Sequence, residues 1–179
     1  GKRAKIHIKL DTGMGRLGFQ TIPASIAKVE RVLNLEGIMV EGIYTHFAMA
    51  DSSKVFTQRQ SLKFQQMVET LENRGFEFPI KHVSNSAALI RDSHLNLDMV
   101  RPGIALYGLS PFLDKQGEEL TLRPVMALKS IVIHIKSLGA GSSIGYGGRY
   151  VLKRPGAIAT IPIGYADGWS RKLYPGGSV

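Results

Sequence analysis

The chain has 179 residues, of which 44% are hydrophobic and 21% charged, a balance typical of globular proteins, and this length leaves room for one domain or parts of two. It shows no apolar run of membrane-spanning length and no signal-peptide pattern, so we expect no membrane partner. The absence of cysteine excludes disulfides, thiolate catalysis and thiolate metal sites, and it fits a reducing compartment.

The chain is basic, with a formal net charge of 23 − 14 = +9, which would attract nucleic acid or another anion. The basic residues are spread along the chain, with only short doublets such as Lys153-Arg154. There is no aromatic and basic platform of the kind that single-stranded nucleic acid requires. We therefore expect no nucleic-acid partner, and we favour a basic surface around a small anionic ligand.

The first 110 residues alternate between strand and helix patterns. The expected elements are a strand at Lys5–Leu10, a helix at Ala24–Leu33 ended by Gly37, a strand at Ile38–His46, a helix at Thr57–Asn73 closed by Gly75, a strand at Ile80–Ser84, a helix at Ser86–Arg91 and a fourth extended segment at Met99–Tyr107 broken by Pro102-Gly103. Repeated strand-helix-strand units imply a parallel sheet with right-handed crossovers. Four units without an obvious edge strand indicate part of a (β/α) barrel in an α/β fold.

The pattern changes after residue 110. Ser110–Arg123 is polar and irregular, and strands and turns without helices are expected over Val125–Leu138, Gly139–Tyr150 and Ala157–Ile163. We place a domain boundary near residue 120, with a partial barrel over 1–120 and the start of a β-rich domain over 121–179. The chain begins almost inside a strand and stops at a turn, so we expect it to be an excerpt of a longer polypeptide.

A glycine-rich loop follows the first strand. The segment Lys9–Phe19 contains Gly13, Gly15 and Gly18 together with Lys9 and Arg16. Glycines allow a tight turn that keeps charged side chains near the end of a rigid strand, as cofactor pockets often do. A strand-to-helix turn with solvated charges explains the same residues, because the spacing is not that of a P-loop or a dinucleotide fingerprint.

Polar residues follow the other expected strands as well, and active sites of barrels lie at the carboxyl ends of the strands. The candidates are Lys9, Arg16, His46, Asn85, Ser86, Arg101, Gly103 and Ile104. Each also has a structural explanation: His46 as a buried histidine, Lys9 as a solvated cation, and Asn85-Ser86 as a helix cap that could equally face a phosphate. Pro102 keeps Arg101 extended, and Gly103 allows a close backbone approach to a ligand.

One tyrosine stands among the glycines of the second part, in Gly145-Tyr146-Gly147-Gly148. The residues alone allow a turn tyrosine packed on a neighbour, or a catalytic phenol with a cation nearby to lower its pKa.

Six motifs, in order and with fitting spacings, resemble the alanine racemase family: Lys9–Phe19, Tyr44–Phe47 with Asp51, His82–Ser86, Val100–Gly108, Gly145–Gly147 and Ile163–Gly168. The resemblance covers essentially the whole chain. It implies a pyridoxal 5'-phosphate (PLP) enzyme that interconverts L- and D-alanine for peptidoglycan in the cytoplasm. The implied fold is the C-terminal half of a (β/α)8 barrel followed by a β-rich domain, in a head-to-tail homodimer with shared active sites.

The resemblance also implies roles for individual residues. Arg101 matches the arginine on the cofactor's pyridine nitrogen, and a guanidinium there keeps that nitrogen unprotonated. Tyr146 matches the catalytic tyrosine that serves the other subunit on the L-alanine face, with His46 between it and Arg101. Arg16 matches the arginine at the cofactor's phenolic oxygen and the substrate carboxylate, and Lys9 matches a carbamylated lysine beside that arginine. The matches at the phosphate are Ser86, Gly103 and Ile104, with Asn85 next to them. The matches at the substrate entrance are Asp51, Tyr165 and Arg171, and the resemblance implies no metal.

The family's lysine that holds the cofactor and serves the D-alanine face would precede this chain, so we expect the excerpt to be inactive alone. Two other activities stay open within this resemblance: a racemase for serine or for a broader set of amino acids, and a non-catalytic PLP-binding barrel. The β-rich segment and Tyr146 disfavour the second.

Overall fold

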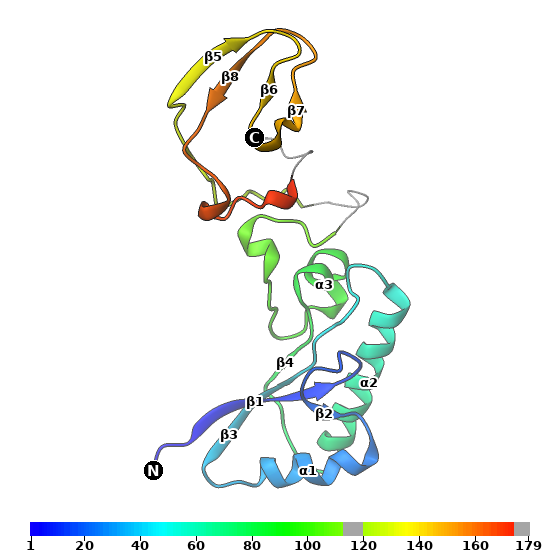
Figure 1. Ribbon diagram of the computed structural model, residues 1–179. Helices are drawn as coiled ribbons and strands as arrows, with labels where there is room; N and C mark the ends of the chain where they lie inside the picture. The colour runs from blue at the N-terminus through cyan, green and yellow to red at the C-terminus, as the bar shows by residue number, and fades with distance from the viewer. Residues whose placement is uncertain (113–119, 174–179) are drawn as a thin grey trace. The chain divides into compact units, whose positions relative to one another are not determined.

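The computed structural model describes residues 1–112 and 120–173, and the chain divides into two compact units, Gly1–Met126 and Ala127–Val179, which are described separately. Figure 1 shows the elements of both units. The first unit contains β1 (Ala4–Asp11), β2 (Phe19–Gln20), α1 (Pro23–Leu33), β3 (Ile38–Tyr44), α2 (Lys54–Glu72), β4 (Ile80–His82), α3 (Ser86–Arg91) and the 3-10 helices η1 (Ser93–Leu95) and η2 (Ile104–Tyr107). The second contains β5 (His134–Leu138), β6 (Ser143–Ile144), η3 (Tyr146–Gly148), β7 (Tyr150–Val151), β8 (Gly156–Thr160), η4 (Tyr165–Asp167) and η5 (Arg171–Leu173).

The first unit is built on a four-stranded parallel sheet in the order β2-β1-β3-β4. The register aligns Lys9 with Tyr44 and Tyr44 with His82, so these three residues form one row across the sheet. The parallel sheet with helical crossovers confirms the predicted α/β class.

One face of this sheet carries the hydrophobic core. Ile8 and Leu10 of β1 and Ile43 of β3 are buried against Val29 of α1 and Phe64 of α2, and Figure 1 shows both helices beside the strands. Since successive side chains of a strand point to opposite faces, the intervening residues of β1 project from the other face. That second face is polar, and the candidate site lies beyond the carboxyl ends of the strands.

Capping residues set the helix ends more than the predicted glycines do. The helix α1 begins at Pro23 and ends at Leu33, the predicted last residue, and the N–H groups of Asn34 and Leu35 bond to Glu30 O and Val32 O. The prediction that Gly37 ends it was wrong. The helix α2 begins earlier than predicted because the Ser53 side chain accepts a hydrogen bond from Phe56 N–H. Gly75, which was predicted to close α2, has a left-handed conformation with φ 88°.

The fourth extended segment, predicted over Met99–Tyr107 with a break at Pro102-Gly103, does break there but forms no strand in the described part of the chain. Its first residues run beside the end of β4, where Arg101 N–H bonds to Ser84 O. Pro102 has no N–H to continue a ladder, and Ile104–Tyr107 forms the 3-10 helix η2. Arg101, Gly103 and Ile104 therefore lie in a turn and not on a strand. The short strand β2, which pairs with β1 at Leu10 and Phe19, was not predicted.

The second unit is β-rich, as predicted. The strands β5 and β8 pair antiparallel, as do β6 and β7. The strand predicted over Val125–Leu138 was too long, because the ladder with β8 starts only at His134. The short 3-10 helices η3, η4 and η5 were not predicted. Part of the predicted irregular segment Ser110–Arg123, and the end of the chain, lie outside the described residues.

The position of the domain boundary near residue 120 stays a prediction. No helix within residues 1–112 and 120–173 is long and apolar enough to cross a lipid bilayer.

Candidate functional site

The polar residues that follow β1, β3 and β4 come together in the first unit, as expected for the carboxyl ends of parallel strands. An open hollow of about 410 Å³ is lined there by Met14, His46, Phe47, Ala48, Asp51, Asn85, Ser86, Ala87, Arg101, Gly103, Ile104 and Pro111. The hollow brings together seven of the sequence-predicted residues: His46, Asp51, Asn85, Ser86, Arg101, Gly103 and Ile104.

Arg101 lies at the centre of this cluster, and several strand ends hold its guanidinium. Nη2 donates to Thr45 O at 2.7 Å and lies 3.4 Å from both Val83 O and His46 Nδ1, while Nη1 bonds to His82 Nδ1. The Arg101 Cζ also lies 5.0 Å from the centroid of the Tyr44 ring. Such a network fixes both the position and the plane of the guanidinium.

The imidazole of His46 is neutral at neutral pH. Burial is the main reason that its pKa lies below the ordinary value, and the positive charges of Arg101, Arg16 and Lys9 lower it further. A neutral ring can both accept and donate a hydrogen bond, which suits a group placed between Arg101 and a ligand.

The glycine-rich loop is held in shape from both ends. The Asp11 carboxylate accepts hydrogen bonds from the N–H groups of Gly13, Met14 and Gly15, at 2.9–3.1 Å. Gly18 is at φ 115°, and a Cβ there would lie 2.9 Å from Lys9 O, so only glycine fits.

Lys9 lies within β1, buried, and its ammonium donates to Leu17 O at 2.6 Å. Burial lowers the pKa of Lys9; Asp11 opposes this shift, whereas Arg16 and Arg101 add to it. Arg16 itself is exposed on the loop.

A small cradle of polar groups forms where α3 meets the turn after Arg101. The Ser86 Oγ accepts hydrogen bonds from Gly103 N–H at 2.8 Å and from Ala105 N–H at 3.3 Å. A hydroxyl that accepts two hydrogen bonds still has its own proton to donate. A Cβ on Gly103 would meet nothing closer than Ser86 Oγ at 3.9 Å, so the glycine leaves space above the cradle.

Asn85 beside this cradle has a structural function. Its side-chain oxygen caps α3 by accepting from Ala88 N–H at 3.0 Å, and its amide donates to Phe47 O at 3.2 Å. These bonds tie the end of β3 to the start of α3.

A buried polar network fixes the ends of β1 and β3 under the site. Gln60 of α2, only 1% exposed, donates to Thr12 Oγ1 and to His46 O and accepts from Ala48 N–H. The Thr45 hydroxyl donates to Leu10 O at 2.9 Å and lies 2.8 Å from Thr12 Oγ1. Each buried polar group named here has a partner, which holds the His46 backbone in one place.

The second unit carries the other predicted residues. Tyr146 is fully exposed on η3, between Gly145 and Gly147, which both have φ 73°. The Arg171 Cζ lies 5.7 Å from the centroid of the exposed Tyr165 ring, so these two predicted entrance residues are neighbours.

The sequence interpretation gave no function to three residues that hold this site together: His82, Thr45 and Gln60. His82 was recognisable only as part of a motif, and nothing in the sequence marked Gln60, which shares the buried face of α2 with Thr57 and Ser61. Their contacts depend on strand register and helix packing, which a single sequence does not specify.

Comparisons with known proteins agree with this arrangement. The family model described as "Alanine racemase, N-terminal domain" matches residues 1–111, and the model described as "Alanine racemase, C-terminal domain" matches residues 125–179. The chain belongs to the alanine racemase family. The family confirms the predicted part of a (β/α) barrel followed by a β-rich domain.

The alanine racemase of Methanococcus maripaludis is 49% identical over 177 residues, which are 98% of this chain and 48% of that protein. The alanine racemase of Clostridium tetani is 46% identical over 97% of this chain and 45% of its own length. The solved alanine racemase of Clostridium difficile 630 has a TM-score of 0.86 at 45% identity, over 95% of this chain and 45% of that one. The chain thus spans a little under half the length of these relatives.

The chain is also similar to a ligand-bound relative. The alanine racemase of Bacillus anthracis "with bound L-Ala-P" has a TM-score of 0.82 and 36% identity, over 97% of this chain and 45% of that chain.

Proposed function

We propose that the protein of which this chain is part interconverts L- and D-alanine by PLP-dependent, two-base racemisation. The observation that supports this most is the fixed guanidinium of Arg101 in a hollow that also contains the Ser86 cradle. These are the groups that a phosphate-bearing pyridine ring would need: hydrogen-bond donors for the phosphate, and a donor for the ring nitrogen.

The residues of the first unit fit PLP. Ser86, Gly103 and Ile104 would hold the phosphate, with Asn85 supporting them, and Arg101 would face the ring nitrogen. When bound, PLP supplies an electron sink for the bond between the alanine Cα and its hydrogen. A guanidinium cannot give up its proton, so Arg101 would donate a hydrogen bond and leave the ring nitrogen unprotonated, which keeps this sink weak.

Racemisation needs one acid/base group on each face of the alanine Cα. We assign the L-alanine face to the Tyr146 phenol, which would take and return the proton there. Its exposure on η3 suits a group that serves the active site of the other subunit in a head-to-tail homodimer. His46, neutral and in contact with Arg101, would accept or donate a hydrogen bond to hold the phenol. The D-alanine face would belong to a lysine outside this chain.

Arg16 would contact the cofactor's phenolic oxygen and the alanine carboxylate. Lys9 would be carbamylated, because burial beside Arg16 and Arg101 favours its neutral amine, the form that adds to carbon dioxide with loss of a proton. The resulting anion would attract both arginines where an ammonium repels them. Asp51, Tyr165 and Arg171 would line the substrate entrance. Supply of D-alanine for peptidoglycan and a cytoplasmic location complete the proposal.

Circular dichroism of alanine during incubation with the full-length protein tests the activity. We expect L- and D-alanine to converge on the racemate with PLP present, and the activity to fall after PLP is removed and to return when it is added. A clear preference for L-serine would make the protein a serine or broad-specificity racemase. PLP binding without turnover of any amino acid would indicate the non-catalytic barrel.

A further inference from the structure

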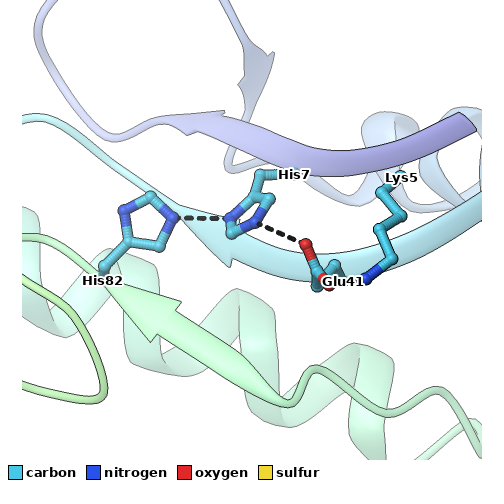
Figure 2. A network of polar contacts seen from close by, with 4 residues as sticks. All are labelled: Lys5, His7, Glu41 and His82. Atoms are coloured by element: carbon cyan, nitrogen blue, oxygen red, sulfur yellow. Dashed lines mark hydrogen bonds and ion pairs between the residues drawn. The ribbon is translucent and has the colours of Figure 1, made fainter.

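A chain of side chains leads from Arg101 away from the candidate site, along the polar face of the sheet. His82 of β4 bonds to Arg101 through Nδ1, and its Nε2 lies 2.7 Å from Nδ1 of His7 on β1. The Nε2 of His7 faces Oε2 of Glu41 on β3 at 3.8 Å, and Glu41 Oε1 accepts from Lys5 Nζ at 2.7 Å. Figure 2 shows His7 between His82 and Glu41.

Local features of the sheet make room for this arrangement. The register of β1 and β3 shifts after Ile6, so that Glu41 has no partner on β1 and His7 pairs with Gly42. A Cβ on Gly42 would lie 2.6 Å from His7 Nδ1 and 2.4 Å from Ile80 O, so a larger residue would displace the imidazole. The Tyr44 ring stacks on His82, with centroids 4.8 Å apart and planes 5° apart.

The direction of the hydrogen bonds follows from the residues at the two ends of this row of side chains, Arg101 and Glu41. The guanidinium of Arg101 can only donate, so His82 Nδ1 must be the acceptor and its proton must be on Nε2. That proton points to His7 Nδ1, which must therefore accept, and His7 keeps its own proton on Nε2. A carboxylate can only accept, and Glu41 offers its oxygen to that proton.

The surroundings of Glu41 and His82 keep these two side chains in the protonation states that the hydrogen bonds require. The hydrogen bond from Lys5 is the main cause that lowers the pKa of Glu41, so Glu41 is a carboxylate at neutral pH. Burial, followed by the charge of Arg101 and by His7, lowers the pKa of His82 to about 4, so His82 is neutral. The 3.8 Å between His7 Nε2 and Glu41 Oε2 exceeds a hydrogen bond, so Glu41 acts on the His7 proton through its charge.

We infer that His7 and Glu41 are positioning residues for Arg101, which act by fixing the tautomer of His82. If His7 carried its proton on Nδ1, two N–H groups would meet unless His82 moved its proton to its own Nδ1. That Nδ1–H would then point at the guanidinium, and the contact that orients Arg101 would be lost. The role in catalysis rests on the proposed function of Arg101, whereas the tautomers do not.

The tautomers can be measured directly. In the full-length holoenzyme labelled with ¹⁵N-histidine, both His7 and His82 should give the signals of neutral rings protonated at Nε2, with assignments from the single variants His7→Gln and His82→Asn. A proton on Nδ1 of His82 would overturn the inference. This result holds even if the enzyme does not racemise alanine.

Kinetics test the effect on Arg101. Glutamine at position 7 can still accept from His82 and donate to Glu41, whereas leucine can do neither. We expect His7→Leu to lower kcat for alanine about tenfold with little change in KM, and His7→Gln to keep most of kcat. His94→Leu, at an exposed histidine of η1 outside this polar network, is the matched control and should leave both constants unchanged.

Equal activity of His7→Leu and His7→Gln would show that His7 only fills space. The PLP absorbance and thermal unfolding of each variant separate loss of positioning from loss of folding. If neither variant folds, the tautomer of His82 in the unmodified protein, assigned with His82→Asn alone, decides.

Discussion

The neutral state of His82 makes the sheet of the first unit sensitive to acid. The pKa of His82 is lowered from 6.5 to about 4, mainly by burial and then by the charge of Arg101. Between these values the unfolded chain binds a proton at this histidine and the folded chain does not, so stability is present above pH 6.5 and is lost as the pH falls towards 4. Linkage over this interval gives a loss of about 2.5 kcal/mol between about pH 7.5 and about pH 4.5.

Hydrogen exchange of the full-length protein, followed by mass spectrometry, measures this loss of stability within the sheet of the first unit. Peptides covering β1, β3 and β4 should lose about 2.5 kcal/mol of opening free energy at the lower pH, after correction for intrinsic exchange rates. In His82→Asn this pH-dependent part should shrink, because asparagine does not titrate. His94→Asn, at an exposed histidine of η1, is the control and should behave as the parent. The same pH dependence in His82→Asn and the parent would refute the reasoning.

Two substitutions test how the site is held. Gly18→Ala should lower the free energy of unfolding by about 1–3 kcal/mol, because the φ of 115° and the Lys9 carbonyl exclude a Cβ. Gly37→Ala, where a Cβ would meet nothing within 4 Å, is the control and should be nearly neutral. Urea unfolding of the full-length protein compares the two variants, and equal effects would contradict the loop geometry. Gln60→Leu leaves the buried Ala48 N–H and His46 O without partners and should lower the free energy of unfolding by about 2–4 kcal/mol. Gln65→Leu, at an exposed position of the same helix, is the control and should change it little. Equal thermal unfolding of the two variants would mean that the buried network does not stabilise the protein.

The sequence was sufficient to predict the alternation of strands and helices, because apolar periodicity depends only on local spacing. The helix Ser86–Arg91 was predicted with its observed bounds, since Asn85 provides a cap that is visible in the sequence. The candidate residues could be gathered at one edge of the sheet because parallel strands end together.

Other features depend on contacts that are distant in sequence. Met99–Tyr107 has the composition of a strand, yet Pro102 removes a ladder donor and Ile104–Tyr107 forms a 3-10 helix. The polar contacts among His7, His82 and Glu41 require the register shift between β1 and β3 after Ile6. The residue pattern of one strand does not predict its register relative to another strand.

The central claim is that Tyr146 provides the acid/base group for one face of alanine, while a group outside this chain serves the other. Exchange of the alanine α-hydrogen in D₂O by full-length Tyr146→Phe holoenzyme tests it most directly, with each enantiomer measured separately. We predict that exchange from L-alanine falls by about a hundredfold or more while exchange from D-alanine persists. Equal rates from both enantiomers, or unchanged racemisation, would contradict the account.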